Sequence, residues 1–350
     1  MAPVREFLVS SITEILHIPC GKFVDDFFGI DPLGVKLTGG YCISVVSDLV
    51  NVPMDTKKDV DDQQTMVLLG MEVAVKAEER EVLTCVDEEK AIDSGIDLDE
   101  VVTSGILPPW RAAKFPGRFS FALTYNADKI GRAFIRPLHA QTHSPIPGDR
   151  LSAAGARSCR WFGAYLRLRP VAVHSAIREK RRHVHIWSDA AGVNRTVAAF
   201  SWCTLYGWRW TSWRTPQSLW DRLLPRQDEQ IGYQEFAGVV LALCTFGQQL
   251  AGQCWTAWID NQGVLLALLK GGARSADLCA GIGQFWIDTA KLRIALQCGR
   301  VCSAANIADE PTRGEYKWVQ KVQAVFVEPI VPEWLRDPWL CPDVPPTRFS

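Results

Sequence analysis

The sequence predicts an α/β fold in which a mixed β-sheet is flanked by helices. Three strand-like runs follow one another between Val184 and Trp213, which is typical of an antiparallel meander. The segment from Gln234 to Leu250 then repeats its apolar residues at helical spacing. A further strand-like run, Cys254–Ile259, precedes a second apolar helical segment, Val264 to Leu269. Alternating strands and helices of this kind indicate one sheet with helices packed on it.

Two acidic residues occupy positions where these elements leave room for chemistry. Asp189 closes the extended run that begins at His185, and three small residues follow it at positions 190–192. A strand that ends in a carboxylate and a small-residue turn leaves space for a metal ion and a phosphate. Glu235 begins the first helical segment, so we expect it to project from the first turn of that helix.

Two more acidic residues have comparable settings further along the chain. Asp260 follows a strand-like run, and Asn261 opens the next helical segment, so the carboxylate lies at a strand-to-helix corner. Asp309 is expected just after a short strand over 301–308, where a loop or helix begins. The four acids therefore come from separate elements and can converge at one end of the sheet. The alternative is that each acid is a helix cap or a solvated residue, because the chain contains 39 Asp and Glu in total.

Four converging carboxylates suit metal-dependent hydrolysis of a phosphodiester. In a two-metal site one ion activates the attacking water and the other stabilises the leaving oxygen, at a separation of roughly 3.5–4 Å. Carboxylates are suitable ligands because Mg²⁺ is a hard ion that prefers oxygen. We therefore predict that Asp189, Glu235, Asp260 and Asp309 are catalytic residues that bind two Mg²⁺ or Mn²⁺ ions.

The chain from about His183 to Gly314 resembles the RNase H domain of retroelement polyproteins. The resemblance implies a mixed five-stranded sheet with flanking helices and with the acids at its centre. No histidine follows His185, so a mobile histidine that some members of the family use near the last acid is absent. The matching pieces are Ser188-Asp189-Ala190, Gln234-Glu235-Phe236-Ala237, Ile259-Asp260-Asn261, Asn306-Ile307-Ala308-Asp309 and Pro311-Thr312-Arg313.

A second resemblance lies near the amino end. The run from Lys22 to Gly29 looks like the paired-aspartate hairpin of a reverse transcriptase palm, with Asp25 and Asp26 as a vestigial polymerase pair. Segments 51–58 and 67–73 match the order of the later palm segments. Taken alone, the aspartate pair is also compatible with an exposed turn. Only 24 residues precede Asp25, so we expect no fingers subdomain, no earlier metal-binding aspartate and no DNA polymerisation by this chain alone.

These resemblances define an expected domain organisation. It begins with a partial palm at residues 1–85 and continues with a helical, thumb-like connection at 86–182, part of which weakly resembles the segment joining palm to RNase H in tyrosine-recombinase-type and related retroelements. The RNase H-like domain follows at 183–314. A proline-rich tail at 315–350 is expected to be extended and loosely packed.

The net charge of −1 conceals two segments of opposite charge. Between Asp55 and Glu100 the sequence has 15 acidic and 5 basic residues, which we interpret as a solvated face. Between Arg150 and Arg182 it has 9 basic residues and one acidic residue, and this segment is predicted to be one amphipathic helix. Its arginines can neutralise nucleic-acid phosphates, or they can extend over the core as an ordinary surface helix does. The residues expected to bind nucleic acid are Arg157, Arg160, Arg167, Arg169 and Asn261.

Other features of the sequence bear on where in the cell the protein is located. The 11 cysteines form no Cys-x-x-Cys pair and are interpreted as reduced thiols of an intracellular protein, either cytoplasmic or nuclear. The sequence has no evident signal peptide and no apolar stretch of the ~20 residues that a membrane span requires, so no membrane partner is expected.

The predicted function is cleavage of the RNA strand of RNA–DNA hybrids by a retroelement-derived fragment. Two alternatives stay open at this point. The chain can be a decayed, non-catalytic remnant that binds nucleic acid, or it can be the carboxyl half of an RNA-directed DNA polymerase whose missing amino-terminal half completes the polymerase site.

Overall fold

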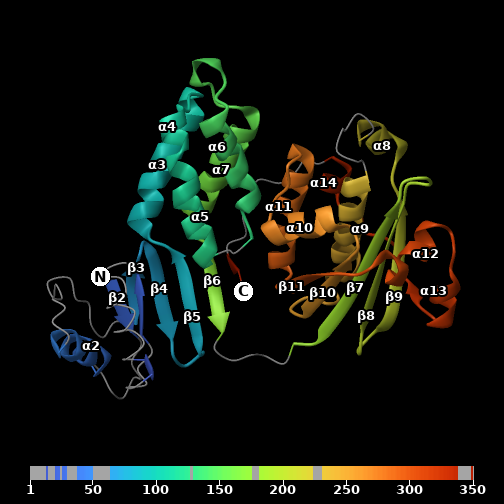
Figure 1. The fold of residues 1–350 in the computed structure, drawn as a ribbon, viewed down its shortest axis with the longest axis horizontal. Coiled ribbons are helices and arrows are strands. Elements are labelled where there is room, and N and C mark those ends of the chain that lie inside the picture. Colours follow the sequence, from blue (N-terminus) through green and yellow to red (C-terminus); the bar gives the residue numbers. More distant parts are fainter. Residues whose placement is uncertain are drawn as a thin grey trace. The chain divides into compact units, whose positions relative to one another are not determined.

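The computed structural model describes residues 13–14, 20–23, 26–29, 38–49, 64–126, 129–175, 181–223, 231–337 and 348–349. The chain divides into two compact units, Met1–Met66 and Val67–Ser350. The fold is mixed α/β and contains a mixed sheet with flanking helices, as the sequence predicts (Figure 1).

In the first unit the structure describes a small hairpin and a helix. Strands β1 (Cys20–Phe23) and β2 (Asp26–Gly29) pair antiparallel, with Phe23 opposite Asp26. Helix α2 covers Thr38–Leu49. Asp26 is therefore the first residue of β2, whereas Asp25 and the predicted palm segment 51–58 lie outside the described residues. The polymerase role of the aspartate pair stays a prediction.

A five-stranded sheet begins at the junction of the two units. Its strand order is β13-β6-β5-β4-β3. Antiparallel pairs join β4 to β5 and β5 to β6. The strands are β3 (Thr65–Leu68), β4 (Met71–Lys76), β5 (Glu81–Val86), β6 (Val171–Ser175) and β13 (Arg348–Phe349).

Five α-helices lie between β5 and β6 in the chain, and the last of them corrects a prediction. Helix α7 ends at Leu168, so the segment 150–182 is not one helix. The next residue, Arg169, has φ 39° and forms a left-handed cap, and Pro170 cannot donate a helical hydrogen bond. The connection is therefore not purely helical, because β6 joins the sheet. The helices are α3 (Glu88–Ser104), α4 (Pro109–Ala112), α5 (Lys114–Asn126), α6 (Arg132–His143) and α7 (Ala153–Leu168).

Stacked aromatic side chains hold these helices together. The rings of Phe119 in α5 and Phe162 in α7 stack with their centroids 4.0 Å apart. Trp161 is fully buried and stacks on Phe134 of α6 at 4.6 Å. Gly131 has φ 86°, and a Cβ atom at this position would lie 2.6 Å from the Trp161 ring, so only glycine fits there.

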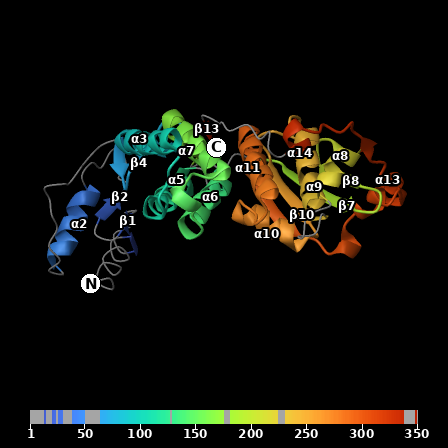
Figure 2. The same cartoon turned by 90° about the horizontal axis from the view of Figure 1, so that it is seen from above.

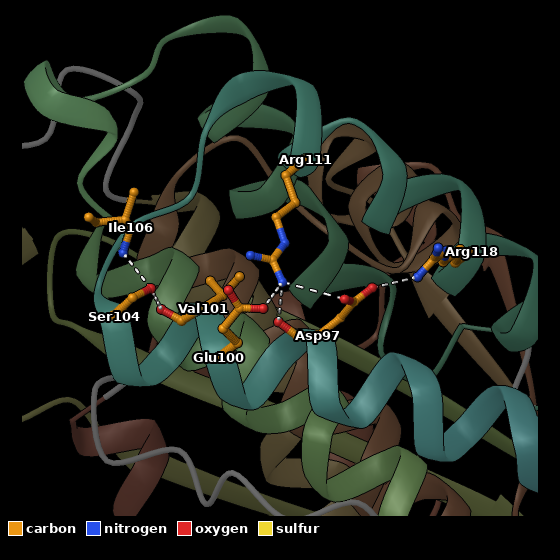
Figure 3. Close-up of polar contacts among 7 residues, drawn as sticks. All are labelled: Asp97, Glu100, Val101, Ser104, Ile106, Arg111 and Arg118. Carbon is orange, nitrogen blue, oxygen red and sulfur yellow. Dashed lines mark hydrogen bonds and ion pairs between the residues drawn. The ribbon is translucent and has the colours of Figure 1, made fainter.

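Ion pairs join the acidic segment to its basic neighbours. Figure 3 shows Arg111 bonded to Asp97 and Glu100 of α3, with the Glu100 contact at 2.7 Å. Arg118 of α5 contacts Asp97 at 3.0 Å. These carboxylates lie on a solvent-exposed face, as predicted, and their ion pairs also connect α3 to α4 and α5.

The second sheet of this unit contains one of the predicted acids, Asp189, in its strand β7. Its order is β11-β10-β7-β8-β9-β12. The antiparallel meander is confirmed in the pairing of β7, β8 and β9, and β10 and β11 extend the sheet in parallel with β7. The strands are β7 (His183–Ala191), β8 (Thr196–Cys203), β9 (Gly207–Arg214), β10 (Cys254–Ile259), β11 (Ala295–Arg300) and the two-residue β12 (Val325–Phe326).

Helix α9 is the central helix of this domain. Figure 2 shows it beside the meander, with α11 next to it. Its residues Phe236 and Val240 are fully buried, which explains why the apolar positions run around most of the helix. The helices after the meander are α8 (Gln217–Leu223), α9 (Ile231–Phe246), α10 (Gln262–Lys270), α11 (Ala276–Lys291), α12 (Asp309–Thr312), α13 (Lys317–Lys321) and α14 (Glu333–Arg336).

The segment after residue 314 corrects the prediction of a loosely packed tail. Trp334 and Leu335 in α14 are buried. The Tyr233 hydroxyl of α9 donates to the Leu335 carbonyl at 3.0 Å, and the Trp334 indole donates to Asp288 of α11 at 3.2 Å. The described part of the tail, up to residue 337, therefore packs on the helices of the domain. Among the described residues, no helix combines the length and apolar character that crossing a bilayer requires.

Candidate metal centre

Three of the four predicted acids converge. Asp189, Glu235 and Asp260 each offer a carboxylate oxygen, and these three oxygens all lie within 4.8 Å of one another. Asp189 comes from β7, Glu235 from α9, and Asp260 directly follows β10. Asp189 lies within its strand and Glu235 in the second turn of its helix, each slightly further into its element than the sequence predicts.

Strand pairing brings two of these acids together. Strand β10 runs parallel to β7, with Trp258 opposite Trp187. Two residues further along each strand the chain reaches Asp260 and Asp189, so the register places both acids at the same level of the sheet. Asn261 then caps α10 by accepting a hydrogen bond from the Val264 amide at 3.1 Å. The predicted strand-to-helix corner at Asp260 is confirmed.

A glycine brings the third acid close. Gly238 lies one helical turn after Glu235 in α9 and is buried against β7. A Cβ atom at Gly238 would lie 2.9 Å from the Ser188 Cβ and 3.5 Å from the Asp189 backbone nitrogen. The missing side chain therefore permits the close approach of helix and strand that brings Glu235 near Asp189.

A loop and a short helix hold Asp189 in place. The Thr312 hydroxyl lies 2.8 Å from Asp189 Oδ2 and 2.8 Å from the Asp309 carbonyl oxygen. The Asn306 amide donates to the Ser188 carbonyl at 3.0 Å and lies 3.5 Å from Asp189 Oδ1. Thr312 and Asn306 are both buried. They fix the orientation of the Asp189 carboxylate, as the hydrogen-bond partners of ligand carboxylates do in metal sites.

Burial and mutual repulsion raise the proton affinity of the site. Loss of hydration raises the pKa of Asp189 to about 6, against the opposing hydrogen bond from Thr312 and with further contributions from Asp260 and Asp309. The same two causes, burial first and then the charges of the other three acids, raise the pKa of Glu235 to about 9. Without a bound cation, the surroundings of the site therefore disfavour ionisation of both carboxyl groups.

Two oxygens of the cluster have no hydrogen-bond partner. Glu235 Oε2 and Asp260 Oδ1 are buried and accept no hydrogen bond. Leaving a buried polar atom unsatisfied costs about 1–3 kcal/mol, and more for a charged group. A cation between the carboxylates would remove this cost, and three carboxylate ligands suit a hard ion such as Mg²⁺ or Mn²⁺. The residues present therefore fit a divalent metal ion.

The fourth predicted acid has another partner. Asp309 begins α12, as expected for a helix start, but the preceding strand is β11, which ends at Arg300. Its Oδ1 accepts a hydrogen bond from Arg313 Nε at 2.8 Å. Asp309 raises the pKa of both Asp189 and Glu235, so it lies near the cluster without belonging to the converging set.

Of the predicted nucleic-acid contacts, Asn261 directly follows Asp260, whereas the four arginines lie on and after α7. Arg167 is exposed and pairs with Asp99 at 3.2 Å. Arg169 pairs with Glu72 at 2.6 Å and donates to the Val86 carbonyl, so it holds α7 to the first sheet of this unit. Arg160 is exposed and Arg157 is half-buried. Positions 157, 160 and 167 are three and seven residues apart and share one side of α7, whereas Arg169 lies beyond the end of the helix. Nucleic-acid binding by these arginines stays a prediction.

Sequence reasoning did not single out Gly238, Thr312 or Asn306 as site residues, although the last two stand inside matching motifs. The signal that could have identified Gly238 is a glycine inside an apolar helix, one turn after a candidate ligand. A scan against protein-family models finds no match, and a search of curated proteins finds no similar sequence.

Proposed function

We propose that this chain is a retroelement-derived polyprotein fragment whose RNase H-like domain hydrolyses the RNA strand of RNA–DNA hybrids in a metal-dependent reaction. The observation that carries the proposal is the convergence of Asp189, Glu235 and Asp260 from three separate elements within 4.8 Å. Further support comes from the mixed sheet, which has the five strands β11-β10-β7-β8-β9 and, beyond the number that the resemblance implies, the two-residue β12 as a sixth.

Each acid has a distinct role in this proposal. Asp189, Glu235 and Asp260 hold the metal, and Thr312 keeps the Asp189 carboxylate aligned. When bound, divalent ions supply an activated water and stabilise charge on the phosphate. Asp309 is the candidate for a fourth ligand, and it serves as one only when it leaves Arg313. The substrate is recognised by its backbone, because 2′-hydroxyls distinguish the RNA strand from DNA.

The test compares two matched substitutions in the full chain. Asp260→Asn removes a ligand charge with little change of shape, whereas Asp93→Asn alters an exposed carboxylate of α3. We expect a labelled RNA–DNA hybrid to be cleaved with Mg²⁺ or Mn²⁺ by the parent protein and by Asp93→Asn, and not by Asp260→Asn. Equal cleavage by all three folded proteins would show that the nuclease activity comes from a contaminant.

One observation favours a second function. Because Asp309 is paired with Arg313, only three acids converge among the described residues, and one ion is then the natural complement of the site. A protein that binds a single ion and nucleic acid without cleaving it is the decayed remnant that the sequence also permits. Tight hybrid binding with no product in Mg²⁺ or Mn²⁺, by protein of normal thermal stability, would favour this second function over the first.

A further inference from the structure

One face of the second sheet carries aromatic side chains that the proposed metal centre does not use. Ser188 of β7 faces α9, because a Cβ atom at Gly238 would lie 2.9 Å from the Ser188 Cβ. Side chains alternate between the two faces of a strand, so every second residue of β7 is on the other face. Strand register and ring contacts place residues of β8, β9 and β10 beside them. We define the aromatic face as His185, Trp187, Trp202, Trp208 and Trp258.

The rings of the aromatic face form one continuous surface that solvent reaches. Neighbouring ring centroids lie 5.4–6.3 Å apart, and all five side chains are partly exposed. Phe200 and Trp210 lie further along the same face of β8 and β9. Phe200 is fully buried, and Trp210 packs against Tyr316 and Phe326. The chain after α12 therefore covers that part of the sheet, while the aromatic face keeps its exposure.

Contacts within the sheet hold the rings in position. The Trp258 indole donates a hydrogen bond to His185 Nδ1 at 3.3 Å, and the planes of the two rings differ by 11°. A Cβ atom at Gly299 of β11 would lie 3.0 Å from the Trp258 ring. The glycine therefore lets the indole lie against the backbone of β11. Side chains that are already ordered lose little further rotamer freedom when a ligand binds.

The charges of the sheet suit an anionic ligand. Strands β7 to β11 contain one acidic residue, Asp189 of the metal centre, and three arginines, at positions 209, 214 and 300. At the α13 side Glu310 accepts a hydrogen bond from the Trp318 amide, and the Trp318 ring contacts Trp208. Phosphates are repelled by carboxylates, so we expect them over β10, β7 and β8, away from Glu310.

We propose that the aromatic face binds single-stranded nucleic acid by stacking bases on its rings. The bases of a duplex stack on one another about 3.4 Å apart and present only their edges in the grooves. Rings 5.4–6.3 Å apart can each take a base only when the bases separate, as they do in single strands. Every base has a π-face, so the proposed site accepts many sequences.

The positions around the rings also favour nucleic acid over a protein helix. On the same face, His183 continues β7, Thr256 continues β10, and Gln297 continues β11. These side chains can form hydrogen bonds with base edges or phosphates. An amphipathic helix instead requires a continuous hydrophobic groove.

The aromatic face lies close to the metal centre along β7. Trp187 precedes Asp189 by two residues, a rise of about 7 Å. A single-stranded overhang of a hybrid bound at the metal centre would therefore pass near the aromatic face. This placement rests on the proposed function, whereas stacking of a single strand does not.

The experiment measures binding of fluorescent oligothymidylate and oligouridylate, each about 12 nucleotides long, to the full chain in EDTA. Trp202→Leu removes one ring of the aromatic face and keeps an apolar side chain on β8. The matched control is Trp210→Leu on the neighbouring strand, where Tyr316 and Phe326 cover the ring. We expect Trp202→Leu to weaken binding roughly 5- to 150-fold, the loss of one stacked base, and Trp210→Leu to leave the affinity unchanged.

Two further variants separate stacking from folding. Trp202→Phe keeps a ring at the same position and should recover most of the affinity that Trp202→Leu loses, at an unchanged melting temperature. Trp187→Leu removes a ring from β7 and should weaken binding as Trp202→Leu does. This pattern supports the proposal whether the DNA strand, the RNA strand or both bind.

Three results would overturn the proposal. The first is equal affinity of the parent protein and both leucine variants of the aromatic face, and the second is a parent protein that binds neither oligonucleotide. The third is self-association that Trp202→Leu abolishes, without strand binding, because the face would then be a contact between two copies of the chain. Strand binding by a parent protein that cleaves no hybrid in Mg²⁺ would instead overturn the proposed function and leave this proposal standing.

Discussion

Two groups of carboxylates in this chain are built in opposite ways. On α3, Asp97 and Glu100 lie at the surface, and Arg111 and Arg118 meet them directly (Figure 3). In the metal centre, Asp189 and Glu235 are buried, and no lysine or arginine forms an ion pair with them among the described contacts. Neighbouring arginines stabilise the carboxylates of the first group, whereas the carboxylates of the second group repel one another.

The difference teaches which acids are candidates for function. The hydrogen bond and charge of Arg111 lower the pKa of Glu100, and the helix gains a contact to α4. Burial and neighbouring acids raise the pKa of Glu235 to about 9, and its Oε2 has no hydrogen-bond partner. A fold retains such an arrangement at a cost in stability, and strongly perturbed carboxylates in one cluster are typical of functional sites. The cation that we propose would offset the charge of the second group, whereas arginines already offset that of the first.

The largest expected effect is on the rate of hybrid cleavage, when one acid of each group is replaced by its amide. Glu235→Gln should lower the initial rate of hybrid cleavage in Mg²⁺ at least about 100-fold, because loss of even an outer-shell partner typically costs 10–100-fold. Glu100→Gln should leave the rate unchanged. Since the pKa of Glu235 is raised to about 9, the metal-free carboxyl is protonated near neutral pH, and Gln should leave the melting temperature in EDTA unchanged.

This prediction is checked with initial rates for both variants beside the parent protein. A folded Glu235→Gln protein whose rate stays within tenfold of the parent would remove Glu235 from the metal centre. A comparable loss in Glu100→Gln would show that the two groups of carboxylates do not differ in the way described.

The second prediction concerns pH, in metal-free protein. The folded-state pKa values of Asp189 and Glu235 are raised to about 6 and about 9, so above about pH 4 the folded state binds more protons than the unfolded state. The free energy of unfolding is therefore greatest at low pH within this window and falls as pH rises, through about 6 for Asp189 and through about 9 for Glu235.

Chemical denaturation in EDTA across this pH range checks whether the free energy of unfolding falls as pH rises. Saturating Mg²⁺ should oppose the fall, because metal binding requires deprotonated ligands and strengthens as pH rises. Glu235→Gln provides the control, because it should abolish the decrease in the free energy of unfolding near pH 9 in EDTA. Stability that increases between pH 6 and 9 in EDTA would contradict the interpretation of the cluster as uncompensated.

The third prediction tests the packing that brings the acids together. Gly238→Ala places a Cβ atom 2.9 Å from the Ser188 Cβ, so α9 must move away from β7. We expect a loss of about 1–3 kcal/mol in the free energy of unfolding, the usual cost of overpacking, together with weaker metal binding. Gly232→Ala, in the same helix and with open space around its Cβ, should be neutral or stabilising by up to about 1 kcal/mol.

Stability and metal binding can both be followed in one experiment, thermal unfolding with and without Mn²⁺. The metal-induced rise in melting temperature should shrink in Gly238→Ala and persist in Gly232→Ala. An unchanged rise in Gly238→Ala would mean that the approach of α9 to β7 is not what positions Glu235.

Much of this arrangement could be predicted from the sequence, because each ligand lies near the end of a strongly patterned element. Alternation between Val184 and Trp213 predicted the meander, and the corner at Asp260 followed from a strand run next to an asparagine cap. Convergence of the acids was expected because successive strands and helices of one sheet expose their ends at common edges.

Other features depend on tertiary contacts that leave no local pattern. Asp309 shares its sequence setting with the other acids, but its carboxylate pairs with Arg313 and lies outside the converging set. Trp334 and Leu335 stand among prolines with no periodicity, and only the surfaces of α9 and α11 bury them. The end of α7 at Leu168 depended on a left-handed Arg169, which is uncommon for a residue with a side chain.

The smallest expected effect comes from removing one carboxylate of the ion-paired group on α3. Asp97→Asn removes the shared partner of Arg111 and Arg118, yet these groups are partly exposed, so water and salt already screen the interaction. We expect the free energy of unfolding to fall by less than about 1 kcal/mol and the difference to disappear in 1 M NaCl, where the screening length is about 3 Å. Asp260→Asn should act in the opposite direction in EDTA at about pH 8, because it relieves repulsion on the buried, ionised Asp189. Salt should diminish that gain far less, since buried charges are poorly screened. Urea unfolding of both variants at low and high salt distinguishes the two responses, and a stabilising Asp97→Asn or a destabilising Asp260→Asn would reverse the assignment of compensated and uncompensated acids.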